Sequence, residues 1–377
     1  MNTRLRLAAI VGGLALLAAA CGEAPEDDTA APEEEEVEPE DEAAPEEEDA
    51  EEEEAPADVD FLGCMVTDEG GVDDRSFNES AWDGLQSAQE AGTIGDARFV
   101  ESNAPADFAP NIQSMIAEDC GIIVTVGFML ADATAEFAEQ SPDENFAIVD
   151  FIYEEPIDNV KPLVFNTHEA AFLAGYVAAG YTETGSVGTW GGAKIPTVTI
   201  FMDGFYDGVQ HYNEQNGTDV EVLGWDKESQ DGQFVGDFSN TTLALQISEN
   251  LLDAGADILL PVAGPLGEQS AIAADGADAT VIWVDVDGYE AVPDYAHLML
   301  TSVMKGISVA VEESANTAAA GDFSNEPFIG TLENDGVGIA PFHDYDDEID
   351  QELKDEVEEL RQQIISGELV VESDAAF

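Results

Sequence analysis

The 377-residue chain contains 83 acidic and 10 basic residues, which gives a formal net charge of −73. A surface with so few cations cannot neutralise a phosphate backbone, so nucleic acid is excluded as a partner. The length suits one large domain or two medium ones. A hydrophobic fraction of 44% is enough for a sizeable core and excludes disorder throughout the chain.

Residues 1–21 have the pattern of a signal peptide. Two arginines precede the apolar run 7–20, which is shorter than the roughly 20 residues that span a bilayer. Small residues before Cys21 resemble a bacterial lipobox, in which the cysteine is lipidated, although Leu17 stands one position early. The alternative is a plain cleavage site with an incidental cysteine. We predict a lipoprotein that lipid on Cys21 holds at the extracytoplasmic face of the cell membrane.

Residues 22–60 contain 22 acidic residues and no basic one. This Glu-, Pro-, Ala- and Asp-rich segment cannot bury enough apolar surface to fold, so we predict a disordered acidic spacer. The rest of the chain is also strongly acidic, with 61 acidic and 8 basic residues. Because salt screens repulsion between like charges, we interpret this surface as halophilic adaptation. The alternative is an ordinary acidic secreted protein.

After residue 60, short apolar runs alternate with segments of helical spacing. Strands are predicted at 61–66, 120–126, 146–149, 256–263 and 281–284. Helices are predicted near 76–88, 112–116, 132–140, 243–252 and 269–274. Ser76 and Glu79 have the spacing of a capping box at the first helix.

The order helix, strand, glycine, helix, strand, aspartate occurs twice, ending at Asp150 and at Asp285. Almost continuously apolar strands between helices indicate parallel sheets covered on both faces. We therefore predict two α/β lobes whose strand ends open toward a crevice, where such sheets bind ligands. An aspartate at such an end can contact a ligand or cap a turn, and the pattern leaves both possibilities open.

The chain lacks the motifs of common catalytic and metal centres. His168 begins like a zinc-protease helix, but Phe172 stands where the second histidine is required. The glycine-rich stretch 185–192 lacks the lysine of a P-loop. We expect no metal, no cofactor and no enzyme activity. Cys64 and Cys120 belong to one lobe and can either pair in an oxidising compartment or remain buried thiols.

Residues 68–78, Asp-Glu-Gly-Gly-Val-Asp-Asp-Arg-Ser-Phe-Asn, resemble the signature after the first strand of the basic membrane protein (BMP) family. These proteins are substrate-binding lipoproteins of ABC importers and include purine nucleoside receptor lipoproteins. Further matches follow in order within 61–342, at 127–128, 146–150, 168–175, 190–192, 195–196, 203–205, 255–257, 262–264, 284–287 and 301–305.

The resemblance implies a type I periplasmic-binding-protein fold, with two Rossmann-like lobes of parallel sheet joined by a three-crossing hinge. Lobe one would comprise 61–162 plus 296–322, and lobe two 163–295 plus 323–370. The partners it implies are a small molecule in the cleft, and the permease and ATPase subunits of an ABC importer.

In the nucleoside-binding members of the family, two phenylalanines sandwich the base. Carried over to this chain, Phe77 is one stacking residue and Phe238 the other, with Phe205 or Phe234 as alternatives for the second. Stacking on two aromatic faces suits the flat rings of a purine.

Polar groups complete the site that the resemblance implies. Asp68 and Asn78 would face the base, and Asp285 and Lys305 would hold the ribose hydroxyls. Asp132 or Asp150 adds a further contact, and Gly264, where a strand stops, belongs to the same ligand-binding set.

We therefore predict an extracytoplasmic substrate-binding lipoprotein that binds a nucleoside of the purine type for transport. One alternative is a binder of a sugar or another small polar ligand. The other is a surface sensor or adhesin, whose long tether presents a protein-binding face.

Overall fold

The computed structural model describes residues 59–377. The predicted signal peptide, Cys21 and almost all of the spacer lie outside the described residues. Within 59–377, every helix is too short or too polar to cross a membrane.

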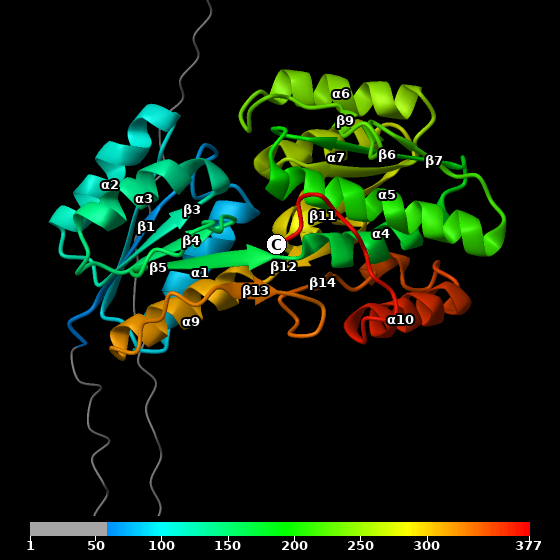
Figure 1. The fold of residues 1–377 in the computed structure, drawn as a ribbon. Coiled ribbons are helices and arrows are strands. Elements are labelled where there is room, and N and C mark those ends of the chain that lie inside the picture. Colours follow the sequence, from blue (N-terminus) through cyan, green and yellow to red (C-terminus); the bar gives the residue numbers. More distant parts are fainter. Residues whose placement is uncertain (1–58) are drawn as a thin grey trace, which may run out of the picture. The chain divides into compact units, whose positions relative to one another are not determined.

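Two six-stranded sheets form the frame of the protein (Figure 1). The first is entirely parallel, in the order β13 (Phe328–Gly330), β5 (Val160–Phe165), β4 (Phe146–Val149), β3 (Ile122–Val126), β1 (Leu62–Val66) and β2 (Asp96–Val100). The second has the order β14 (Val337–Ile339), β12 (Met299–Lys305), β11 (Thr280–Asp285), β10 (Ile258–Val262), β6 (Ser186–Gly191) and β7 (Glu221–Leu223). Only β14 is antiparallel there. Strands β8 (Trp225–Asp226) and β9 (Asp231–Gly232) form a small separate ribbon.

Helices cover both faces of each sheet. We call the first sheet lobe one, with the helices α1 (Phe77–Glu90), α2 (Phe108–Ala117), α3 (Ala131–Gln140) and α9 (Ile307–Ala319). The second sheet is lobe two, with α4 (Thr167–Tyr181), α5 (Pro196–Asn216), α6 (Thr241–Asp253), α7 (Glu268–Asp275), α8 (Gly288–Ala291) and α10 (Gln351–Ile365). Short 3-10 turns occupy Pro105–Asp107, Phe128–Leu130, Gly264–Gly267, Pro293–Leu298 and His343–Tyr345.

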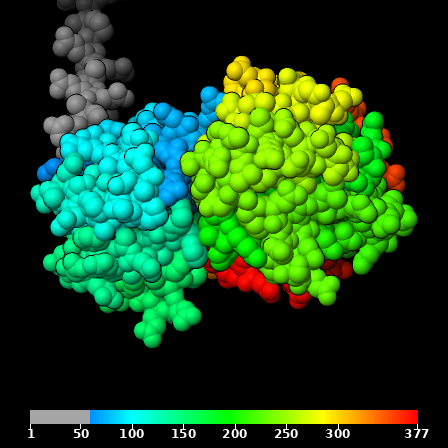
Figure 2. Space-filling model, turned by 90° about the horizontal axis from the view of Figure 1, so that it is seen from above, coloured from blue at the N-terminus to red at the C-terminus, as the bar shows by residue number. Residues whose placement is uncertain are grey.

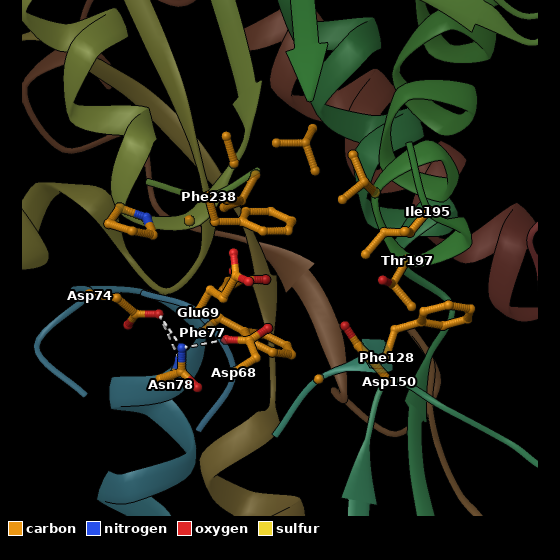
Figure 3. A pocket seen from close by; sticks show the side chains of 18 of the residues that line it. Asp68, Glu69, Asp74, Phe77, Asn78, Phe128, Asp150, Ile195, Thr197 and Phe238 are labelled. Atoms are coloured by element: carbon orange, nitrogen blue, oxygen red, sulfur yellow. Dashed lines mark hydrogen bonds between the residues drawn. The ribbon is translucent and has the colours of Figure 1, made fainter. Parts of the chain in front are cut away.

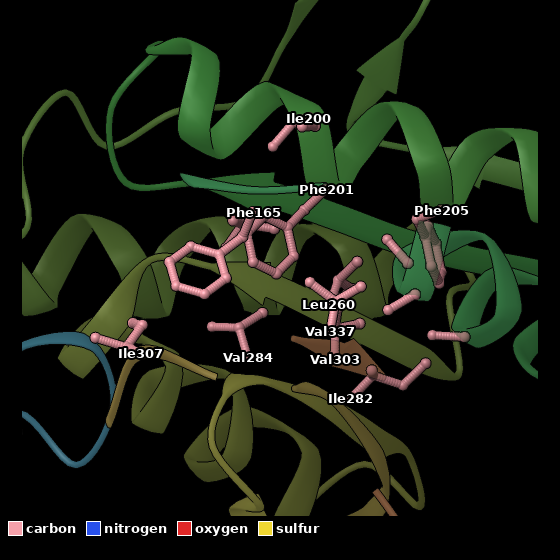
Figure 4. Close-up of a cluster of buried hydrophobic side chains, with 14 of the residues drawn as sticks. Phe165, Ile200, Phe201, Phe205, Leu260, Ile282, Val284, Val303, Ile307 and Val337 are labelled. Atoms are coloured by element: carbon pink, nitrogen blue, oxygen red, sulfur yellow. The ribbon is translucent and has the colours of Figure 1, made fainter. Parts of the chain in front are cut away.

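The predicted strands and helices are confirmed, because strands buried on both faces produce continuous apolar runs. All five residues of β3 and all five of β10 are buried. A single apolar cluster joins the α1 and α9 face of lobe one to the α4 and α5 face of lobe two. Figure 4 shows part of this cluster around Phe165 and Phe201.

Helices α4 and α5 cross at close range because glycines leave room for backbone. A Cβ atom on Gly175 would collide with the backbone of Phe205, and one on Gly204 would collide with the backbone of His168. This contact orients the start of α5 toward the crevice between the lobes.

The chain passes between the sheets three times, after β5, after β12 and between β13 and β14. The positions of the last two passages differ from the predicted ranges. Strand β12 was assigned to lobe one, but it pairs along its length with β11 in lobe two. Strand β13 was assigned to lobe two, but it pairs with β5 in lobe one. Residues beyond 370 also pack on lobe two, where the hydroxyl of Ser373 donates to Asp203.

A disulfide bond joins Cys64 on β1 to Cys120, which directly precedes β3. From the sequence, two buried thiols were at least as well supported as a disulfide. The strands are parallel neighbours, which brings the two Cα atoms to 5.9 Å from each other. Disulfides of this kind persist in oxidising, extracytoplasmic compartments.

Candidate functional site

A pocket lies between the lobes, beside the carboxyl ends of the strands of both sheets (Figure 3). Figure 2 shows the two lobes side by side with the seam between them. The pocket and the open space at its mouth together occupy about 550 Å³. Lobe one contributes Asp68, Glu69, Asp74, Phe77, Asn78, Gly127, Phe128 and Asp150. Lobe two contributes Ile195, Thr197, Val198, Phe201, Phe238, Val262, Ala263, Gly264, Pro265, Val284, Asp285 and Lys305.

Asp74 organises the loop between β1 and α1. Its carboxylate accepts hydrogen bonds from the backbone N–H groups of Ser76, Asn78 and Glu79 at 2.9–3.1 Å, and from the side-chain amide of Asn78 at 3.1 Å. Asp74 therefore satisfies the free N–H groups at the start of α1. Burial raises the pKa of Asp74 to about 6, against the lowering effect of these hydrogen bonds.

Ser76 does not form the predicted capping box, because Asp74 already occupies the free N–H groups of the helix. The hydroxyl of Ser76 instead donates to Oδ2 of Asp285 at 2.8 Å. This bond crosses from lobe one to lobe two, so the end of β11 is tied to the loop before α1.

Lys305 ends β12 and is buried, with 5% of its surface exposed. Its Nζ donates to Oδ2 of Asp150 at 2.6 Å and lies 4.0 Å from Oδ1 of Asp285. Burial raises the pKa of both aspartates, and the charge of Lys305 opposes that rise. The ammonium also lies over the rings of Phe77, Phe165 and Phe201, 4.8–5.8 Å from their centroids.

Asp150 and Asp285 occupy equivalent places in the two lobes. Asp150 directly follows β4 and Asp285 ends β11, and both have positive φ, 68° and 69°. This unusual backbone turns the two side chains toward Lys305 at the boundary of the lobes. The sequence predicted the equivalence of the two positions but not their common cation.

Residues 61–375 match the family described as ABC transporter substrate-binding protein PnrA-like, or Bmp. The chain belongs to the Bmp family. It is 34% identical to a CD4+ T-cell-stimulating antigen of Listeria monocytogenes, over 83% of this chain and 88% of that protein. It is 29% identical to the ABC transporter nucleoside-binding protein BmpA of Lactococcus lactis, over 83% of this chain and 90% of that one.

Solved structures support the same assignment. An ABC transporter solute-binding protein of Aeropyrum pernix superposes with a TM-score of 0.75 at 25% identity, covering 83% of this chain and 94% of that chain. The fold is therefore the type I periplasmic-binding fold of solute-binding proteins. As a Bmp-family member, the chain is a substrate-binding protein of an ABC transporter.

Most of the residues that the sequence singled out for ligand binding line the pocket of this Bmp-family protein. They are Asp68, Phe77, Asn78, Asp150, Phe238, Gly264, Asp285 and Lys305. Their position is established by the structure, whereas their contact with a ligand stays a prediction.

Two predicted site residues lie elsewhere. Asp132 is exposed in the first turn of α3, because the 3-10 turn Phe128–Leu130 carries the chain away from the pocket. Phe205 is fully buried in α5, against Gly175 of α4. Phe234, the other alternative, packs against Trp225 and does not line the pocket.

Several pocket residues were not predicted. Glu69 lies inside the family signature, and Phe128 belongs to a matched segment, so the sequence contained a signal for both. The sequence contained no signal for Thr197 and Phe201, because the first two turns of a long buried helix resemble ordinary core.

We predict that Lys305→Met costs about 3 kcal/mol of unfolding free energy at pH 8, because two buried carboxylates lose their cation. Without Lys305, the pKa values of Asp150 and Asp285 rise further. Both groups then take up protons in the folded state as the pH falls, so the loss should shrink at pH 5. Chemical denaturation at both pH values measures this.

The matched control is Lys194→Met, since Lys194 is exposed and has no hydrogen-bond partner among residues 59–377. This variant should stay within about 0.5 kcal/mol of the wild type. Equal losses for the two lysines, or a loss at Lys305 that does not change with pH, would contradict the role assigned to Lys305.

Proposed function

We propose that this protein binds a purine nucleoside in the pocket between its lobes and delivers it to an ABC importer. One observation carries the proposal: two phenylalanine rings, Phe77 from α1 and Phe238 from the loop before α6, lie on opposite sides of the pocket (Figure 3). Two aromatic rings around a narrow space suit a flat base.

The polar floor of the pocket suits a ribose. The carboxylate of Asp285 already accepts a hydrogen bond from one hydroxyl, that of Ser76. A ribose hydroxyl can replace it there, while the ammonium of Lys305 donates to a second ribose oxygen. The Lactococcus relative is named a nucleoside-binding protein, and that name points to the same ligand class.

We also propose that the protein is an exported lipoprotein, anchored through Cys21, that meets permease and ATPase subunits at the membrane. The support is the sequence pattern around Cys21, the family of transporter substrate-binding proteins, and the Cys64–Cys120 disulfide bond.

Isothermal titration calorimetry tests the ligand class. We expect guanosine, inosine or adenosine to bind at least about 10-fold more tightly than ribose, because stacking contributes roughly 1–3 kcal/mol per base. Phe77→Ala and Phe238→Ala should remove most of this difference. Phe99→Ala, on the edge strand β2, is the control and should retain it. Ribose binding as tight as nucleoside binding would favour a sugar receptor instead.

We further propose that the acidic surface is an adaptation to salt. The chain after residue 60 has 61 acidic and 8 basic residues, so folding brings like charges together. Raising salt from about 0.1 to 1 M shortens the Debye length from about 10 to 3 Å. The urea midpoint of residues 58–377 should therefore rise clearly, and a midpoint that stays flat or falls would refute the adaptation.

A further inference from the structure

The pocket contains carboxylates that the protein itself already uses. Asp74 accepts four hydrogen bonds from its own loop and the start of α1, Asp150 is paired with Lys305, and Asp285 accepts from Ser76. Asp150 and Asp285 join the two sides of the pocket, and Asp74 holds the start of α1 in place. They are not the groups most available to the edge of a base.

Glu69 differs from them. It lines the pocket and is half-buried, yet its carboxylate has no hydrogen bond or ion pair to any of residues 59–377. In the view of Figure 3 its side chain lies between the Phe238 ring and the Phe77 ring. A carboxylate without a partner beside an aromatic slot offers two acceptor oxygens to whatever enters the slot.

The neighbouring Asp68 offers a complementary group. Its Oδ1 accepts from the amide of Asn78 at 2.9 Å, whereas its Oδ2 has no donor among the described residues and faces Gly127. Burial raises the pKa of Asp68 well above its usual value, and the charges of Asp74, Asp150 and Glu69 raise it further. A protonated Asp68 donates a hydrogen bond where Glu69 only accepts.

Purine bases differ in the hydrogen-bond donors and acceptors on the edge that carries N1 and the substituents at C2 and C6. Guanine presents two adjacent donors, N1–H and the 2-amino group, next to the acceptor O6. Hypoxanthine has N1–H and O6 but no 2-amino group, and adenine has a ring acceptor in place of N1–H. A carboxylate matches two parallel N–H donors best, and such charge-assisted pairs are among the strongest hydrogen bonds.

We propose that Glu69 is a specificity-determining residue that accepts from N1–H and the 2-amino group of a guanine ring, so that the site prefers guanosine. This inference rests on the proposed nucleoside function. Asp68, in its protonated form, donates a hydrogen bond to O6 of the same base. Phe77 and Phe238 stack on the two faces of the base. Asp285 and Lys305 stay assigned to the ribose, as in the proposed function.

Calorimetry with ligands that differ by one group tests the proposal. Guanosine is compared with inosine, which lacks the 2-amino group, and with 1-methylguanosine, in which N1 is blocked. In the wild type, guanosine should bind about 10-fold more tightly than either, as expected when a charged group loses one hydrogen-bond partner. In Glu69→Gln this preference should fall to about 3-fold or less.

Glu90→Gln is the matched control, because it removes the same charge from an exposed position at the end of α1. It should keep the 10-fold preference. The urea midpoint of Glu69→Gln should equal that of the wild type, which separates a change in selectivity from a change in folding.

The outcomes distinguish this inference from the function on which it rests. If nucleosides bind but Glu69→Gln keeps the preference for guanosine, or the wild type favours inosine, the role of Glu69 is refuted and the nucleoside site stands. If no nucleoside binds the wild type, the proposed function is refuted and the inference falls with it.

Discussion

The buried ammonium of Lys305 is the group around which the cleft is arranged. Two sheets end in an aspartate at the same boundary, Asp150 from lobe one and Asp285 from lobe two, and both are almost completely buried. Two carboxylates in an apolar site cannot both stay ionised without a cation. Lys305 supplies it, 2.6 Å from one and 4.0 Å from the other. The rings of Phe77 and Phe201 lie beside the ammonium and exclude water from it.

The hydrogen bonds that join the lobes are made by the same side chains that we propose to bind the ligand. Lys305 bridges to Asp150 across the boundary, and Ser76 bridges to Asp285 in the other direction. The carboxylate of Asp285 already accepts a hydrogen bond from the hydroxyl of Ser76. A ligand hydroxyl that takes the place of Ser76 replaces this bond with an equivalent one, so the buried carboxylate is not left unpaired. Binding can thus exchange partners without disturbing the charge balance at Lys305. A binding protein that must also release its ligand to a transporter benefits from such an exchange.

The sequence was sufficient to predict the strands whose ends form the site, but not to place all of the side chains in it. Strands buried on both faces and the recurring terminal aspartates made Asp150 and Asp285 predictable. Phe205 was misplaced because the close crossing of α4 and α5 depends on glycine contacts between segments distant in the sequence. Asp132 was misplaced because one 3-10 turn redirects the chain. Ser76 had the spacing of a cap, but competition from Asp74 for the same N–H groups appears only in three dimensions.

A crystal structure of the protein with inosine bound tests the proposed nucleoside site most directly. We expect the base between the rings of Phe77 and Phe238, with ribose hydroxyls within hydrogen-bond distance of Asp285 and Lys305. Ser76 should have released the carboxylate of Asp285. A nucleoside bound outside the cleft, or one whose ribose contacts neither Asp285 nor Lys305, would refute this arrangement of the site.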